Sequence, residues 1–222
     1  MDTQKSPISQ IMNSFDVSFF KAIEESVNNS FAQAQLTSQR MFKEPEQVSG
    51  RAQLRHCLCE SGMREVAENF GLVSHALHTE PRGGRYSVIQ NRNIFILRTN
   101  IQTHCGTPRA TKFRQEWSQF NAWLEPQQMD LFQEVKEPPA DRLCAMLVVS
   151  AQNQSGDQEL PAYVGIGVPH SDLSGWIFRM SISEILALYH DQDTEHSPQH
   201  EPQVIIKDKA FPVLKKKNDG KN

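Results

Sequence analysis

The chain has 222 residues, of which 38% are hydrophobic and 22% are charged, and its formal net charge is -3. These values exclude a short disulfide-stapled module, a strongly biased polymer and a wholly basic protein that coats nucleic acid. They are typical of a globular protein with one domain or, at most, two small ones.

The N-terminus and the cysteines indicate where the protein works. The first ten residues are polar and lack the apolar segment of a secretory signal peptide. In a reducing compartment the four cysteines do not need to form disulfides. The longest apolar stretches, such as 143–149, are much shorter than the roughly 20 residues that cross a bilayer. We therefore expect a cytoplasmic protein that does not enter a membrane.

Amphipathic helices are expected in the first 70 residues. Within 8–40, apolar residues recur at intervals of four, which predicts one long helix or two shorter ones. The pattern breaks near Pro45 and resumes over 51–70, where Gly71 is a candidate C-terminal cap. The apolar side of this second segment consists of Leu54, Leu58, Val66 and Phe70.

The middle of the chain contains the signals of a β-hairpin and a further helix. A turn at 81–84 precedes two expected strands, 85–89 and 94–101. Thr107 and Pro108 then have the pattern of an N-cap followed by the first helical residue. Large apolar side chains follow at helical spacing, which predicts a helix that packs on the core: Phe113, Trp117, Phe120 and Leu124.

The second half of the chain is expected to complete a sheet. The continuous apolar run 143–149 predicts a central strand that is buried on both faces. Two more strands are expected at 163–168 and 176–180. Ser181 and Glu184 have the spacing of a capping box, which predicts a short final helix.

The predicted fold class is α+β, with N-terminal helices packed on a mixed or antiparallel sheet, a further buried helix and a flexible basic C-terminal tail. We divide the chain into an N-terminal helical region, 1–50, an α+β core domain, 51–190, and a flexible linker with a basic tail, 191–222. No sequence repeat with a period of 20 to 50 residues is visible.

The net charge conceals an uneven distribution. Residues 82–114 contain seven Arg and Lys residues and no Asp or Glu, so this segment alone carries +7. Clustered cations neutralise phosphates and release their counterions, which makes such a segment a candidate surface for an anionic partner. Solvated surface charge is the simpler alternative.

The predicted helix start adds to this hypothesis. Arg109 and Lys112 would lie in its first turn, where the helix dipole disfavours cations unless an anion is bound. We therefore predict an anion-binding or nucleic-acid-binding surface formed by Arg85, Arg92, Arg98, Arg109, Lys112 and Arg114.

Enzymatic alternatives have weaker support. Arg51 and His56 match the Arg-x4–6-His spacing of HEPN-type ribonucleases, although about one such match is expected by chance in this chain. A metal-dependent nuclease would need acidic residues in the strands, and the hairpin at 85–101 contains none. The Cys and His residues do not have the paired spacing of a structural zinc site. We therefore assign no metal and no cofactor.

The sequence favours a non-enzymatic binding or regulatory protein that contacts nucleic acid or an acidic protein surface. A nuclease or another phosphodiester hydrolase is the first alternative. An oligomeric interaction module, assembled through the N-terminal helices, is the second.

Overall fold

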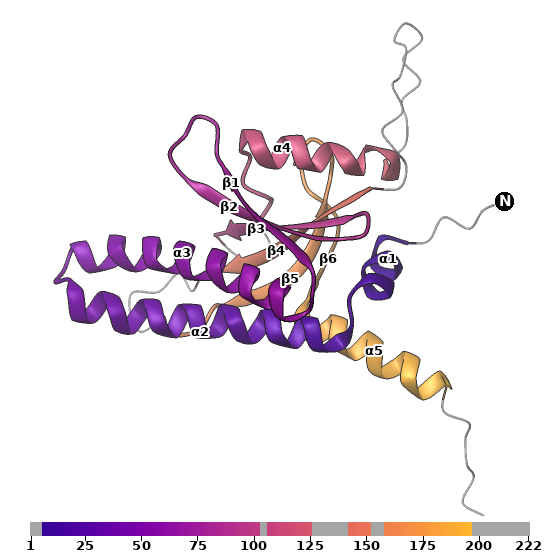
Figure 1. The fold of residues 1–222 in the computed structure, drawn as a ribbon, viewed down its shortest axis with the longest axis horizontal. Coiled ribbons are helices and arrows are strands. Elements are labelled where there is room, and N and C mark those ends of the chain that lie inside the picture. Colours follow the sequence, from indigo (N-terminus) through magenta and orange to yellow (C-terminus); the bar gives the residue numbers. More distant parts are fainter. Residues whose placement is uncertain (1–5, 103–105, 126–141, 152–157, 197–222) are drawn as a thin grey trace, which may run out of the picture.

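The computed structural model describes residues 6–102, 106–125, 142–151 and 158–196, without the side chains of 192–196. Five α-helices, a short 3-10 helix and six strands lie in these residues (Figure 1). In chain order they are α1 (Pro7–Ser14), α2 (Val17–Met41), α3 (Glu46–Asn69), β1 (Val73–His78), β2 (Arg85–Asn91), β3 (Ile94–Ile101), α4 (Lys112–Ser118), η1 (Gln119–Leu124), β4 (Leu143–Ser150), β5 (Tyr163–Pro169), β6 (Trp176–Ser181) and α5 (Ile182–His196).

The six strands form one mixed sheet in the order β1-β2-β3-β4-β5-β6. Adjacent strands are antiparallel except β3 and β4, which run parallel with Ile94 opposite Leu143. The segment between them crosses one face of the sheet through α4 and η1, because parallel neighbours need a crossover connection. The α+β class and the mixed sheet expected from the sequence are therefore confirmed.

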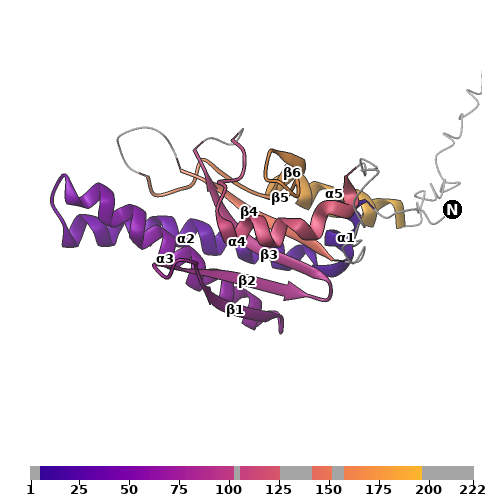
Figure 2. The same ribbon diagram turned by 90° about the horizontal axis from the view of Figure 1, so that it is seen from above.

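Helices cover both faces of the sheet. The long α2–α3 hairpin lies against one face and α4 lies against the other, and both views show this separation (Figures 1 and 2). The period-2 alternation of strands divides the core accordingly. In β4, for example, Ala145 and Leu147 belong to the apolar cluster with α2 and α3, whereas Cys144 belongs to the cluster with α4. All eight residues of β4 are buried, as the apolar run predicts.

Capping residues explain several of the boundaries. The first helical segment divides into α1 and α2 because Asp16 accepts a hydrogen bond from the backbone N–H of Phe19 at 3.1 Å and begins a new helix. Ser181 and Glu184 form the reciprocal capping box predicted for α5. The strand β1 was not predicted. It lies at the edge of the sheet, and its side chains are mostly exposed.

The predicted helix start at Thr107 is wrong. The helix begins at Lys112, and Thr111 is its N-cap residue with an extended backbone. The side chain of Arg114 donates hydrogen bonds to the carbonyl of Arg109 at 3.4 Å and to the hydroxyl of Thr111 at 3.3 Å. These bonds favour an extended segment before the helix, and α4 has only seven residues.

The predicted domain boundaries stay predictions. Helix α3 begins at Glu46 and therefore crosses the boundary expected at residue 50. The largest apolar cluster joins α1, α2 and α3 to the sheet and to α5. Beyond residue 196, the expected basic tail lies outside the described residues.

No helix among the described residues has the length and apolar character needed to cross a membrane.

Candidate functional site

Helix α3 presents a row of polar side chains to the sheet. His56, Glu60 and Arg64 are four residues apart and therefore lie along one side of the helix. Strands β2 and β3 supply two buried partners, Ser87 and Arg98. Glu60 is only 7% exposed and Arg98 only 5%. We call these five residues the charge cluster.

Glu60 lies at the centre of the charge cluster. Its Oε1 accepts a hydrogen bond from Arg98 Nε at 3.0 Å, and its Oε2 accepts one from the backbone N–H of Ser87 at 2.5 Å. The Ser87 hydroxyl donates to the backbone carbonyl of Glu60 at 2.9 Å. These partners compensate for the hydration that a buried carboxylate loses. The ion pair with Arg98 therefore anchors α3 to β3, and the Ser87 hydrogen bonds anchor it to β2.

His56 is held as a neutral imidazole. Arg98 Nη2 lies 2.7 Å from His56 Nδ1, and because a guanidinium group only donates, Nδ1 accepts and carries no proton. Burial and then the charge of Arg98 lower the pKa of His56 below its ordinary value. Glu60, 3.9 Å away, acts in the opposite direction without reversing this effect. His56 is thus engaged in structure on its Nδ1 side.

Arg114 extends from α4 to β3. Its Nε and Nη2 donate to the backbone carbonyl of Arg98 at 3.4 Å and 3.1 Å, and its guanidinium group lies over the ring of Phe113. Burial and the nearby charge of Arg98 lower the pKa of Arg114 to about 10. Arg114 therefore stays protonated at neutral pH and links α4 to β3.

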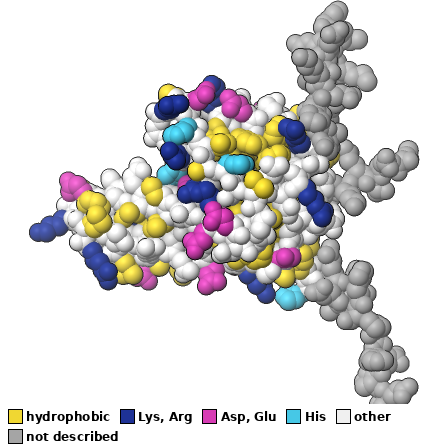
Figure 3. Space-filling model, in the orientation of Figure 1, with side chains coloured by type: hydrophobic (Ala, Val, Ile, Leu, Met, Phe, Trp, Pro, Cys, Tyr) yellow, Lys and Arg dark blue, Asp and Glu magenta, His cyan; other side chains and the backbone are white. Residues whose placement is uncertain are grey.

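A pocket of about 690 Å³ opens beside the charge cluster. It lies between α3 on one side and β1, the start of β2 and their connecting loop on the other. Figure 3 shows Lys, Arg and His side chains on this part of the surface, with Asp and Glu side chains beside them. We call it the basic pocket, and its lining residues are Gln53, His56, Cys57, Glu60, Arg64, Ala76, His78, Arg82, Gly83, Gly84 and Arg85.

The basic pocket contains more positive than negative charge. Glu60 is the one acidic residue in its lining, and Arg98 already neutralises Glu60. Arg64, Arg82 and Arg85 form no ion pair within 4.0 Å with any acidic side chain in the described part of the chain. Arg64 donates instead to the neutral Ser87 hydroxyl at 2.6 Å. The pocket can therefore offer guanidinium donors to an anion.

The six cations predicted as one surface lie in different surroundings. Arg85 lines the basic pocket, whereas Arg98 is buried in the charge cluster and does not face solvent. Arg92 lies at the turn between β2 and β3, at the opposite end of β2 from Arg85. The structure thus places Arg85 and Arg92 far apart along the hairpin.

The other three predicted cations lie around the beginning of α4. Lys112 is exposed and forms an ion pair with Glu80 at 2.8 Å. Arg109 precedes the helix and is exposed. Arg114 packs inward as described above. Among these three, only Arg109 is an exposed cation without an acidic partner in the described residues.

Sequence reasoning missed Arg64, Arg82 and His78 as pocket residues. Arg82 belongs to the segment of high positive charge, but its position beside α3 depends on the pairing of β1 with β2. The four-residue spacing of His56, Glu60 and Arg64 was a visible signal, because it places three polar side chains on one side of a helix.

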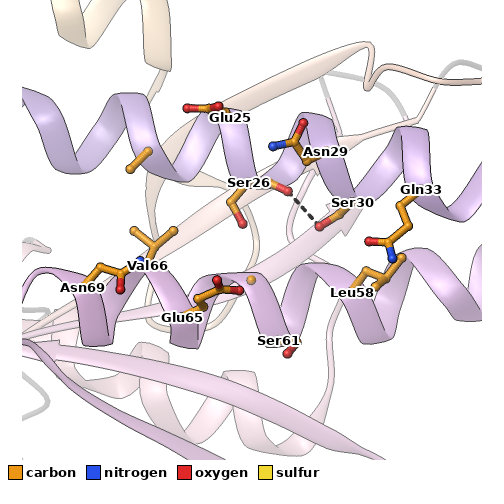
Figure 4. Close-up of a pocket in the computed structure, with 12 residues that line it drawn as sticks. Glu25, Ser26, Asn29, Ser30, Gln33, Leu58, Ser61, Glu65, Val66 and Asn69 are labelled. Atoms are coloured by element: carbon orange, nitrogen blue, oxygen red, sulfur yellow. Dashed lines mark hydrogen bonds between the residues drawn. The ribbon is translucent and has the colours of Figure 1, made fainter.

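A second pocket has an acidic lining, in contrast to the basic pocket. It is a groove of about 430 Å³ between α2 and α3, and its lining includes Glu25 and Glu65 but neither Lys nor Arg (Figure 4). The helices approach closely here, since a Cβ atom on Gly62 would lie 2.3 Å from the Ser26 hydroxyl. Because its lining contains two carboxylates and neither Lys nor Arg, the groove does not attract an anion.

The residues considered for enzymatic chemistry do not converge. Arg51 donates to the side chain of Gln35 in α2 at 2.8 Å, whereas His56 bonds to Arg98 in the sheet. The Arg-x4–6-His pair thus points to two different neighbours. In the described residues, no three His, Cys, Asp or Glu side chains gather closely enough to hold a metal ion. His104 and Cys105 lie outside the described residues.

Comparison with known proteins identifies no relative of this chain. No family model matches the chain, and neither the curated proteins nor the solved structures contain a significant match.

Proposed function

We propose that the protein is a non-enzymatic binding or regulatory protein that contacts nucleic acid through the basic pocket. The observation that carries the proposal is the set of three arginines, Arg64, Arg82 and Arg85, which lack acidic partners in the described residues and line one pocket. Guanidinium groups bind phosphate oxygens through paired, charge-assisted hydrogen bonds. An acidic protein surface is the alternative partner, since carboxylates accept the same donors.

The environment of His56 favours binding over hydrolysis. A general base needs a free lone pair within reach of the substrate proton, and His56 Nδ1 already accepts from Arg98. Protonation is also disfavoured, because burial and Arg98 lower its pKa. A nuclease or another phosphodiester hydrolase stays the enzymatic alternative.

Binding across a salt series tests the proposal. Labelled DNA, labelled RNA and an acidic polypeptide are titrated with the full chain from low to high salt, with and without Mg²⁺. Nucleic-acid binding that weakens steeply with salt supports the proposal, because phosphate contacts release counterions. Binding of the acidic polypeptide alone contradicts the nucleic-acid partner, and magnesium-dependent cleavage of the labelled strand supports the hydrolase instead.

Oligomerisation through the N-terminal helices is a second candidate function, supported by a separate surface. The end of the α2–α3 hairpin projects beyond the sheet (Figure 1). Its large apolar side chains are exposed, including Met41 at 65% and Val48 at 49%. Exposed apolar patches often mark protein interfaces. Sedimentation of the wild type and of M41S/V48S tests this oligomerisation, which the two substitutions should weaken. A wild-type protein that is monomeric at every concentration would contradict it.

A further inference from the structure

We infer that the basic pocket recognises a phosphate monoester, the doubly charged group at the end of a phosphorylated strand or on a nucleotide. A continuous run of backbone phosphodiesters would fit the observed arrangement less well. This inference rests on the proposed function and specifies which phosphate the site binds.

The first argument is the placement of the unpaired cations. Each strand of duplex DNA carries one charge for about every 3.4 Å of helix axis, so a surface that follows a nucleic-acid backbone needs a row of accessible cations. The cations of segment 82–114 do not form such a row. Arg98 is buried, Lys112 is paired with Glu80, and Arg92 lies at the far end of β2. Arg109 is exposed but is not part of the pocket lining. Arg82 and Arg85 instead share one pocket with Arg64.

The second argument is charge. A phosphate monoester carries about -1.5 to -2 at pH 7 and presents three terminal oxygens, whereas a phosphodiester carries one charge. Arg64, Arg82 and Arg85 together exceed the charge of a single phosphodiester. The nearby carboxylate of Glu60 does not cancel them, because it is paired with Arg98. The positive charge of the three arginines therefore matches a doubly charged phosphate monoester better than a singly charged phosphodiester.

The third argument is the way in which Arg64 is held. Its Nη1 donates to the Ser87 hydroxyl, and Ser87 is fixed in turn by two hydrogen bonds to Glu60. The guanidinium group is thus positioned by the fold before any ligand binds, which lowers the entropic cost of binding. The same contacts use only part of its donor capacity, since a guanidinium group has five N–H donors.

The size of the pocket indicates that more than a phosphate enters. Ligand pockets typically measure about 300 to 1,000 Å³, and the basic pocket has about 690 Å³. Its lining also includes the imidazole of His78 and the small side chains of Ala76 and Cys57. A nucleotide attached to the phosphate would occupy this space, either free or as the end of a strand.

The test compares strand ends. Three identical single-stranded 12-mers with an internal label carry a 5′-phosphate, a 3′-phosphate or neither, and their affinities for the full chain are measured by fluorescence anisotropy at one salt concentration. We expect one phosphorylated strand to bind about 10-fold more tightly than the strand without a phosphate, the effect of one added charge-assisted contact. Competition with AMP and with inorganic phosphate distinguishes a free nucleotide from a strand end.

Matched variants connect the effect to the pocket. R82A/R85A removes two exposed cations and should abolish the preference for the phosphorylated strand. R92N removes an exposed cation outside the pocket and should retain the preference, and Asn tolerates the positive φ of 52° at this position. Circular dichroism checks that both variants are folded.

Two results would overturn the inference: equal affinity of wild type for all three strands, or a preference that survives in R82A/R85A. In the first case nucleic-acid binding itself still supports the proposed function. The proposed function fails as well when no strand binds at low salt, or when R82A/R85A binds every strand as tightly as wild type does.

Discussion

The charge cluster and the basic pocket have His56, Glu60 and Arg64 in common, but charged residues play different roles in the two regions. In the charge cluster, Arg98 is buried and its charge is matched by Glu60. In the basic pocket, Arg82 and Arg85 are exposed and have no acidic partner in the described residues. Buried charges require a partner, whereas exposed cations without one remain available to a ligand. Arginine content alone therefore does not identify a binding surface.

Removing the central carboxylate should have the largest effect. Glu60→Ala leaves the Arg98 guanidinium group buried without its counter-charge, which typically costs about 3 to 5 kcal/mol. Urea unfolding measures the loss. Glu65→Ala, an exposed residue on the same helix, is the control and should change stability by less than about 0.5 kcal/mol. A loss below about 1 kcal/mol in Glu60→Ala would show that the charge cluster does not anchor α3.

Arg64 belongs to both regions, so its removal should affect both properties. Arg64→Ala deletes the hydrogen bond to Ser87, which contributes about 1 kcal/mol to the free energy of unfolding. It also removes one guanidinium group from the basic pocket and should weaken nucleic-acid binding. Unfolding and binding are measured on the same sample. A variant with lower stability and unchanged affinity would assign Arg64 to the charge cluster alone.

The neutral state of His56 predicts a pH effect on stability. Its pKa in the folded protein lies below the ordinary value of 6.5, so below pH 6.5 the unfolded chain takes up a proton that the folded chain resists. The free energy of unfolding should therefore fall as the pH drops below 6.5. Urea unfolding between pH 7.5 and 5.5 measures this, and His56→Asn should show a shallower dependence. Equal slopes for both proteins would contradict the assignment.

The sequence predicted the fold better than it predicted the site. Apolar periodicity identified the buried strand at 143–149, and the capping box identified the start of α5. The same reasoning placed Leu54 and Leu58 on the buried side of α3, yet both are only partly buried. Arg55 and Glu60 are buried instead. Periodicity assumes that the buried side is apolar. Arg55 and Glu60 of α3 violate this assumption, whereas Met63, Val66 and Ala67 follow it.

The site depended on information that is not local in the sequence. Arg64 and Arg82 line the same pocket only because β1, an edge strand with little apolar pattern, pairs with β2 and brings the β1–β2 loop beside α3. Hydrogen bonds from Arg114 to Arg109 and Thr111 accompany the helix start at Lys112, and the motif at Thr107 could not indicate them. Local patterns therefore located most of the elements, though not β1, and tertiary pairing determined which cations stay accessible.

The most direct test of the central claim is the salt dependence of nucleic-acid binding in three proteins: wild type, R82A/R85A and R92N. The dissociation constant of a single-stranded oligonucleotide is measured across a salt series. Each lost phosphate contact reduces the slope of log K against log salt by about 1. We predict a slope smaller by about 1 to 2 in R82A/R85A and an unchanged slope in R92N. An unchanged slope in R82A/R85A, or an equal reduction in R92N, would contradict the basic pocket as the binding site.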